Sequence, residues 1–485
     1  MKKFFKRRPV NRHEKGSGAI TLTVIALFLA CNLFLVPLGS AFRLFTSVVD
    51  KQFYTLNGST DAYFDAINPE KKPVDFYFCM SEESLNENYT YGRILDTVRQ
   101  FSLRYDFISL SFLDVYYDYD FIKKDLGVEE SVTSDSVILY SAGIGYVVRS
   151  LSTFYIYDTE DTSNDDMIFN GEEIMATLVY RVLHKNFPKV YFTVGHGETS
   201  TQSMQNLFFS AGYDVWTADL SKNEIEEECS TIVISNPLYD FEEFKDGSSS
   251  EISRLDEFLA RGGTLIVLRS PLAGELPRLD ALCEKYGLSV KVGALLRDSE
   301  HSISSNAAAL LLRYSDSDAA KAISLRTSLA GDLGDIAAKN VTSLTLADKN
   351  GCRVSPLIES YDSAALYRDG KRLSEGVHTV AAQSTVNGKD GKTGTLILIG
   401  TTGLGEAALL DLGSYGNEAF LYALLERTEG ISVTPIGCGV VVLNTYPLTN
   451  LSGKDANTYF LALTLGVPAV LGVLGLLLIR RRRNR

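Results

Sequence analysis

The chain has 485 residues, of which 45% are hydrophobic, and its formal net charge is −13. This length exceeds one ordinary domain, so we expect two or three, and the apolar content excludes a chain that is disordered throughout. An acidic surface also argues against a nucleic-acid partner, because binding to phosphates needs basic side chains.

Positive charge is concentrated at the two ends of the chain. The first 15 residues and the last six hold 12 of the 47 Lys and Arg residues, but only one of the 60 acidic residues. The part between them therefore carries 35 basic and 59 acidic residues, a net charge of −24.

Each basic end adjoins a long stretch without charged residues, at 16–42 and at 459–479. Both stretches are long enough to cross a bilayer as a helix, and we predict transmembrane helices over 19–39 and 459–479. A signal peptide cut near Gly39, Ser40 and Ala41 is the alternative for the first stretch, although its apolar run exceeds the usual signal core.

These two spans predict a topology. Lys and Arg accumulate on the cytoplasmic side of membranes, so the basic tails at 1–18 and 480–485 should both be cytoplasmic. Residues 43–458 then form one extracytoplasmic body of a two-pass plasma-membrane protein.

The cysteines are widely spaced and include no CxxC pair. Outside the first span they are an odd number, so we predict neither a disulfide framework nor a zinc site. We predict no metal and no cofactor.

The first part of the body predicts a small α/β subdomain over 50–160. Its pattern indicates a strand at 74–79, a helix at 90–105, a strand at 107–115 and three short strands at 136–141, 146–151 and 153–158. On the helix, the apolar residues expected mostly on one face are Ile94, Leu95, Val98, Phe101 and Leu103.

The second part predicts an α/β domain over 170–299. Helical and strand patterns alternate, with strands at 189–194, 213–220, 230–235 and 264–268 and helices at 170–186, 201–212, 248–263 and 277–287. The strands are nearly continuous apolar runs, which is typical of a parallel sheet buried on both faces. This pattern breaks at 300–390, where we predict an inserted mixed subdomain with a short helix over 306–314.

The alternation resumes at 394–430, which we expect to return to the same sheet. A β-rich membrane-proximal segment at 431–458 then leads to the second span. For the helix starts we predict capping pairs of Asn170 with Glu173 and of Ser248 with Glu251, and Thr199 as a cap for the helix over 201–212.

Polar side chains follow several of the predicted parallel strands. His196 and Glu198 lie in the Gly-His-Gly-Glu turn after the strand at 189–194, and Asn236 and Asp240 follow the strand at 230–235. Arg269 and Glu275 follow the next strand in the chain. Ligands bind at the carboxyl ends of strands in an open parallel sheet, so these six residues form a candidate binding edge.

Chemistry at this edge lacks a nucleophile in the sequence. No loop carries the GxSxG pattern of a nucleophile elbow, because Asn236 and Pro237 follow Ser235 and Pro271 follows Ser270. We therefore predict no catalytic residue and a chain that is not an enzyme. The alternative interpretation of the Gly-His-Gly-Glu segment is a structural turn.

Taken together, the ordered motifs resemble the GldG-like auxiliary component of ABC transport systems, a family first associated with gliding motility. The matching stretches are KQFYTLNGSTDAYFDAI after the first span, VDFYFC, NGEEIMATLVYRVL, KVYFTVGHGE, AGYDVWTADL, STIVISNP, ISRLDEFLARGGTLIVLRSP, and GTLILIG with GNEAFLYALLE. The final apolar span with its arginines completes the pattern. Thr401 and Thr402 stand where relatives tend to carry an acidic residue.

The resemblance implies a thioredoxin-like N-terminal subdomain and a class I glutamine amidotransferase-like, flavodoxin-like domain without its catalytic cysteine. It also implies an ABC permease and a cytoplasmic ABC ATPase as partners. Our leading hypothesis is thus a non-enzymatic, membrane-anchored auxiliary subunit of an ABC-2-like system. The alternatives are an extracytoplasmic ligand-binding or sensing module, and an envelope hydrolase that uses His196 and Glu198.

Overall fold

The computed structural model describes the body of the chain. The described residues are 56, 58–157, 167–199, 201–242, 250–303, 306–330, 334–349, 351–388, 391–410, 415–429, 434–438 and 441–443. All of them belong to one compact unit that begins at Leu56. The predicted spans and basic tails lie outside the described residues. Among the described residues, no helix has the length and apolar character to cross a bilayer.

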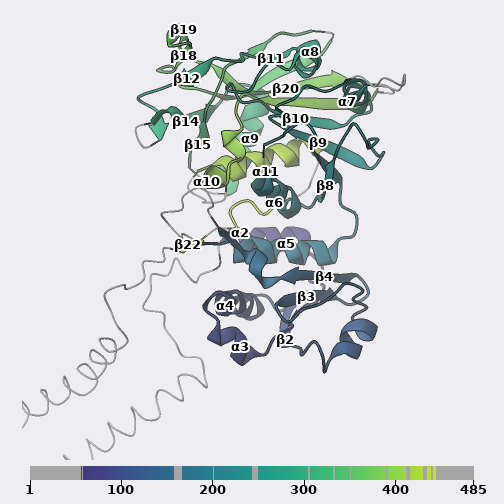
Figure 1. The fold of residues 1–485 in the computed structure, drawn as a ribbon. Coiled ribbons are helices and arrows are strands. Elements are labelled where there is room, and N and C mark those ends of the chain that lie inside the picture. The colour runs from purple at the N-terminus through teal and green to yellow at the C-terminus, as the bar shows by residue number, and fades with distance from the viewer. Residues whose placement is uncertain are drawn as a thin grey trace, which may run out of the picture. The chain divides into compact units, whose positions relative to one another are not determined.

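The first sheet has four strands in the order β2-β1-β3-β4 (Figure 1). β1 is parallel to β2 and antiparallel to β3, and β3 is antiparallel to β4. The elements of this region are α2 (Gly58–Ile67), β1 (Val74–Phe78), α3 (Glu82–Glu87), α4 (Tyr89–Arg104), β2 (Ile108–Phe112), η2 (Phe121–Asp125), β3 (Ser136–Ser141), β4 (Gly145–Ser150) and η3 (Leu151–Phe154). The predicted βαβ unit and the first two short strands are confirmed.

Helix α4 packs on this sheet as its periodicity predicts, with one exception. Ile94, Leu95, Val98 and Phe101 are buried, but Leu103 is exposed. Leu103 follows Phe101 by two positions, which turns it to the opposite side of a helix with 3.6 residues per turn. Its placement on the apolar face was wrong.

The next helix, α5 (Gly171–Leu183), packs on the first sheet rather than on the second. Its residues Met175, Leu178, Val179 and Val182 share a core cluster with side chains from β1, β3 and α4. The alternating pattern had placed this helix in the predicted domain over 170–299, but its core contacts are with the first sheet. The third short strand, β5 (Tyr155–Tyr157), joins a separate sheet with β6 (Met167–Phe169) and β22 (Val441–Leu443).

The second sheet contains five adjacent parallel strands in the order β21-β10-β9-β7-β8. They are β7 (Lys189–Thr193), β8 (Asp214–Ala218), β9 (Cys229–Ser235), β10 (Thr264–Leu268) and β21 (Thr393–Ile399). Read from β8 to β21, with the five strands numbered along the chain, this order is 2-1-3-4-5, the doubly wound arrangement of flavodoxin-like folds. The predicted parallel α/β sheet is confirmed, including the return of residues near 394 to it.

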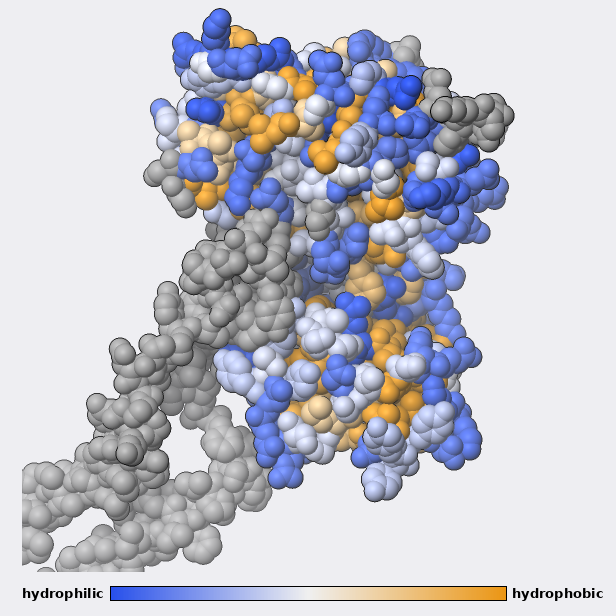
Figure 2. Space-filling view, viewed as in Figure 1, coloured by the Kyte–Doolittle hydropathy of each residue, from blue (hydrophilic) through white to orange (hydrophobic). Residues whose placement is uncertain are grey.

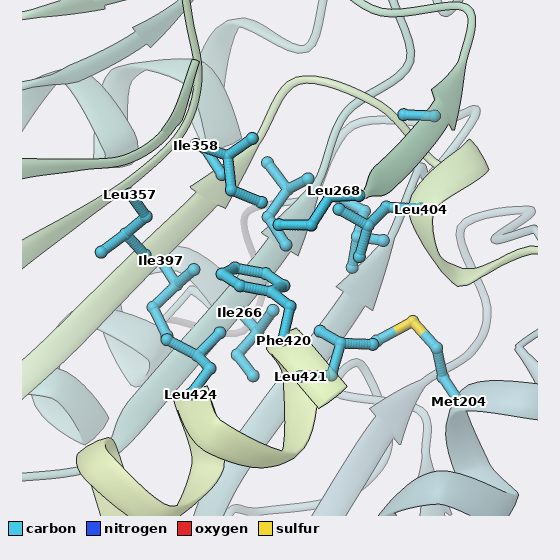
Figure 3. Close-up of a cluster of buried hydrophobic side chains, with 14 of the residues drawn as sticks. Met204, Ile266, Leu268, Leu357, Ile358, Ile397, Leu404, Phe420, Leu421 and Leu424 are labelled. Atoms are coloured by element: carbon cyan, nitrogen blue, oxygen red, sulfur yellow. The ribbon is translucent and has the colours of Figure 1, made fainter. Parts of the chain in front are cut away.

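Helices cover both faces of these strands, because alternate side chains of each strand point to opposite sides. One face packs on α6 (Gln202–Ser210) and α11 (Asn417–Glu429), and Figure 3 shows Phe420, Leu421 and Leu424 of α11 against Ile266 and Ile397 of the sheet. The other face packs on α7 (Glu251–Ala260) and α8 (Pro277–Lys285).

Residues near 300–390 extend the same sheet with antiparallel strands beyond β21. The extension follows the order β20-β17-β14-β13, and β15 also pairs with β14. These strands are β13 (Ser302–Ile303), β14 (Asn306–Tyr314), β15 (Ile336–Lys339), β17 (Arg353–Glu359) and β20 (Thr379–Asn387). Smaller sheets pair β11 (Leu288–Val290) with β16 (Leu344–Leu346), and β12 (Leu295–Arg297) with β18 (Ala365–Arg368) and β19 (Lys371–Glu375).

The predicted helix over 306–314 was wrong, because this segment is strand β14. A short run of Ala and Leu does not distinguish a buried helix from a buried strand. Here β14 is hydrogen-bonded to β13, β15 and β17, and these tertiary pairings override its helix propensity. Helix α9 (Asp318–Ala330) follows it in the chain. The predicted domain boundaries themselves stay predictions.

Candidate functional site

The point where the parallel sheet reverses its strand order lies between β7 and β9. From β7 the chain proceeds to β8 on one side, and from β9 it proceeds through β10 to β21 on the other. Ligands of doubly wound folds bind in the crevice beyond the carboxyl ends of such strands. The segment with His196 and Glu198 and the segment with Asn236 and Asp240 leave the sheet at this place.

His196 is buried and lies between two carboxylates. Its Nε2 is 3.1 Å from Oε2 of Glu251, and its Nδ1 is 3.6 Å from Oε1 of Glu198. The imidazole stacks on the ring of Phe241, with 4.2 Å between ring centroids. The structure thus brings together His196 and Glu198 as expected, and adds Glu251 and Phe241.

The Gly-His-Gly-Glu segment is fixed by its backbone as well. The His196 N–H donates to Oε2 of Glu198 at 2.8 Å, while the His196 carbonyl accepts from the N–H groups of Leu238 and Tyr239. Gly197 has a φ of 71°, which a residue with a Cβ adopts only with strain, and its own Cβ would meet Leu238 at 3.2 Å. The positive φ, together with the close approach of the two loops, therefore favours glycine at this position.

Glu251 was predicted to close a capping box with Ser248, and this was wrong. The N-cap of α7 is Ser250, whose side chain accepts from the Ser253 N–H, and Glu251 is the first residue of the helix. Its fully buried carboxylate also accepts from the Glu242 N–H at 2.8 Å. Ser248 lies outside the described residues.

His196 and the neighbouring carboxylates shift one another's pKa values toward the charged forms. Burial lowers the pKa of the His196 imidazole, but the nearby carboxylate of Glu198 and the hydrogen-bonded carboxylate of Glu251 outweigh it and raise the pKa from 6.5 to about 10. Burial likewise raises the pKa of Glu198, but hydrogen bonds from His196 and from backbone N–H groups lower it below its ordinary value. His196 is therefore an imidazolium held between carboxylates at neutral pH.

Asn236 joins three loops at the same edge. Its φ is 48°, its N–H donates to the Leu268 carbonyl, and its Oδ1 accepts from the Ser270 N–H at 3.0 Å. Its Nδ2 lies 3.4 Å from Oγ1 of Thr199. Thr199 does not cap α6 as predicted, since the N-cap of that helix is Thr201.

Asp240 and Arg269 also have structural partners. Asp240 accepts from the N–H groups of Arg278 and Leu279, and so caps α8 from outside the helix. Arg269 is almost completely buried, and its Nε and Nη2 reach the two carboxylate oxygens of Asp280 at 3.2 and 3.1 Å. Glu275 is exposed, and its side chain takes no part in the contacts described for this edge.

The first predicted cap, Asn170 with Glu173, is confirmed in its position, since Asn170 is the N-cap residue of α5, but not in its hydrogen bonds. The Asn170 side chain makes no cap hydrogen bond, and its Nδ2 instead donates to Oε2 of Glu173 at 2.6 Å. Glu173 also accepts from the Tyr422 hydroxyl of α11. In the loop after β21, Thr401 is buried and donates to the Lys339 carbonyl at 2.6 Å, so β15 occupies that part of the edge.

The burial of the ionisable side chains limits the acid–base chemistry that this edge of the sheet can support. An acid or base must reach the proton that it transfers, and His196, Glu198 and Glu251 are all buried against protein. Ser235 and Ser270, at the ends of β9 and β10, are buried too. Sequence patterns could not have found Glu251 or Phe241, because only the packing of α7 brings them to His196.

The body is thus an α/β protein whose parallel sheet has a flavodoxin-like strand order. No protein-family model and no curated protein matches the chain. Solved structures similar to part of it include the mmIFT52 N-terminal domain, at 15% identity and a TM-score of 0.38, which covers 50% of this chain and 99% of that one.

Two further solved structures are similar to part of the chain at lower TM-scores. A glutamine amidotransferase from Thermotoga maritima is 12% identical with a TM-score of 0.29, covering 52% of this chain and 100% of that one. The carbohydrate deacetylase Agd3 is 13% identical with a TM-score of 0.29, covering 49% of this chain and 32% of that one. The order of the parallel strands alone defines the flavodoxin-like arrangement of this sheet.

Proposed function

We propose that this chain is a non-enzymatic, membrane-anchored auxiliary subunit of an ABC-2-like transport system. Its spans are the apolar stretches at 19–39 and 459–479, and its body engages the permease, or the substrate that leaves it, outside the membrane. A cytoplasmic ABC ATPase supplies the energy. The ordered motifs of the GldG-like family are the first support for this role.

The observation that carries the proposal is the meeting of the two ends of the body. Tyr63 and Phe64 of α2 share a core cluster with Cys438, and β22 pairs with β6 in the same region (Figure 1). The predicted spans lie just beyond these ends in the sequence. A body whose first and last elements pack together suits attachment to one membrane surface at both ends.

The strand orders support the same family. The order β2-β1-β3-β4, with one parallel and two antiparallel pairs, fits a thioredoxin-like subdomain, although Cys79 after β1 has no CxxC partner. The five parallel strands fit a class I amidotransferase-like domain. The buried ion cluster at His196 and the absence of a nucleophile elbow in the sequence favour a role without catalysis.

An exposed apolar surface offers a contact for a partner. Val194, Leu238, Tyr239 and Leu272 follow strands β7, β9 and β10, and all four side chains are exposed at the carboxyl edge of the sheet. Figure 2 shows that apolar patches also interrupt the hydrophilic surface on the face drawn there. Clustered exposed apolar side chains mark interaction surfaces more often than single ones do.

Co-purification tests the proposal. Membranes solubilised in a mild detergent should yield this chain together with a permease and an ABC ATPase. Leu272→Glu should reduce recovery of the permease about tenfold, which corresponds to about 1.4 kcal/mol of binding free energy. The matched control is Leu325→Glu on α9, because Leu272 and Leu325 are 66% and 64% exposed. Recovery of this chain alone, where other transporter complexes survive, would refute the proposal.

A second candidate function is a ligand-binding module, and one observation favours it. A cavity of about 440 Å³ lies among β4, β5, α5, α6 and α11, within the size range of small-molecule sites. The third alternative, a hydrolase that uses His196 and Glu198, has no comparable support, because both side chains are buried in an ion cluster.

A further inference from the structure

The cavity has polar groups on several sides. Arg149 comes from β4, Asn170 and Glu173 from the start of α5, and Asn206 and Ser210 from α6. Phe209 contributes an aromatic ring to the wall. None of these residues belongs to the ion cluster at His196, so the cavity is a separate candidate site.

Arg149 brings a positive charge that no carboxylate neutralises within the described residues. Its Nε donates to Oγ1 of Thr153 at 2.9 Å, and its guanidinium lies 4.8 Å from the centroid of the Phe209 ring. Burial lowers the pKa of Arg149, which shows that its surroundings disfavour an unpaired cation. A guanidinium in such a place binds carboxylates well, because its planar donors match two oxygens.

Asn170 brings an unsatisfied acceptor. The residue is 8% exposed, and its Nδ2 donates to the carboxylate of Glu173. Because a carboxylate accepts hydrogen bonds, this contact assigns Nδ2 to the atom that faces Glu173, so the remaining amide atom is the acceptor Oδ1. Oδ1 is buried and has no hydrogen-bond partner. A buried acceptor without a donor is costly, and a ligand with a hydroxyl or an amide N–H would satisfy it.

The buried carboxylate of Glu173 limits the charge of the occupant. Glu173 is 4% exposed and is held by Asn170 and by the hydroxyl of Tyr422. A second negative charge on the ligand would be repelled at this side of the cavity, where burial strengthens electrostatic interactions.

We propose that this cavity binds a small molecule with a single carboxylate and several hydroxyl or amide donors. The carboxylate pairs with Arg149, and a donor group satisfies Oδ1 of Asn170. This inference rests on the ligand-binding role given above as the second candidate function, and does not depend on the association with a permease.

Thermal unfolding of the full-length protein in detergent tests the inference with two pairs of probes. Gluconate and N-acetyl-L-glutamine each carry one carboxylate, and sorbitol and N-acetyl-L-glutamine amide are their neutral counterparts. At least one of the two anions should raise the melting temperature by about 2 °C or more in a saturable manner. The neutral counterparts should produce no saturable rise.

Variants assign the effect to the cavity. Arg149→Gln should abolish the shift produced by the anion. Arg297→Gln should keep it, since Arg297 also lies over an aromatic ring, that of Tyr367, but does not line the cavity. If Arg149→Gln does not fold, chemical modification of the wild-type protein tests the same point. The active anion should protect Arg149, but not Arg297, from modification by phenylglyoxal, as measured by mass spectrometry.

Three results would overturn the inference. If neither anion stabilises the protein, or if Arg149→Gln responds like the wild type, the cavity does not bind carboxylates through Arg149. Saturable stabilisation by sorbitol or by the neutral amide, without any effect of the anions, would reject the proposed ligand class and leave the ligand-binding role standing.

Discussion

Nε2 of His196 lies 3.1 Å from Oε2 of Glu251, a residue 55 positions further along the chain. This contact joins the loop after β7 to the first turn of α7. Glu251 is fully buried, and His196 is nearly so. The Gly-His-Gly-Glu segment therefore holds a buried charge pair where doubly wound folds usually bind a ligand.

Glu251→Gln should destabilise the body strongly. The substitution removes one partner of a buried ion pair and leaves the imidazolium with Glu198 alone, so we expect a loss of about 3 kcal/mol in the free energy of unfolding. Urea denaturation measures this loss. Glu257→Gln, on an exposed position of the same helix, should change stability by less than about 0.5 kcal/mol. Equal effects of the two substitutions would contradict a structural role for Glu251.

Stability should depend on pH through His196. Because the pKa of His196 is about 10 in the folded protein and near 6.5 unfolded, its contribution is fully present below about pH 6.5 and disappears as the pH rises through 10. The stability difference between wild type and His196→Gln should therefore shrink between pH 6.5 and 10.

The stability contribution of Glu198 has the opposite pH dependence, since it is lost as the pH falls. Its pKa is lowered in the folded protein, so its contribution is present above about pH 4.5 and is lost as the pH falls through its folded value. Urea unfolding of wild type and His196→Gln from about pH 3 to 10 follows both effects. A difference that stays constant from pH 6 to 10 would show that His196 is not held as an imidazolium.

Asp240→Ala should remove a helix cap. The Asp240 carboxylate accepts from the N–H groups of Arg278 and Leu279 in the first turn of α8. Loss of a side-chain cap usually costs about 1 kcal/mol of stability, and Asp240→Asn should recover part of it. Thermal unfolding measures both variants. If Asp240→Ala kept full stability but lost a ligand, Asp240 would belong to a binding site, as the sequence analysis expected.

Arg269 and Asp280 should prove coupled. Asp280→Ala leaves the Arg269 cation almost completely buried without its carboxylate, so we expect a cost of about 3 kcal/mol or more. Arg269→Met should also destabilise the body, and the double variant should cost less than both single changes together. A double-mutant cycle in urea measures the coupling energy. Additive costs would mean that the ion pair contributes nothing.

Several features of this protein followed from its sequence. The alternation of apolar strands and amphipathic helices predicted the parallel sheet, because a sheet buried on both faces needs nearly continuous apolar strands. Boundaries near Gly212 and Gly263 were predictable as well, since glycine ends helices at positive φ or in tight packing. The membrane topology, which rests on the two uncharged stretches with basic flanks, stays a prediction, because both stretches lie outside the described residues.

Tertiary structure decided the rest. It made 306–314 a strand, because three neighbouring strands pair with it, and it placed α5 on the first sheet. It also decided that the polar residues of the sheet edge form helix caps and ion pairs. Glu251 reaches His196 only when α7 packs on the sheet, and Asp280 reaches Arg269 only when α8 does. Local sequence sets periodicity and turns, but a buried charge finds its partner only through packing of distant segments.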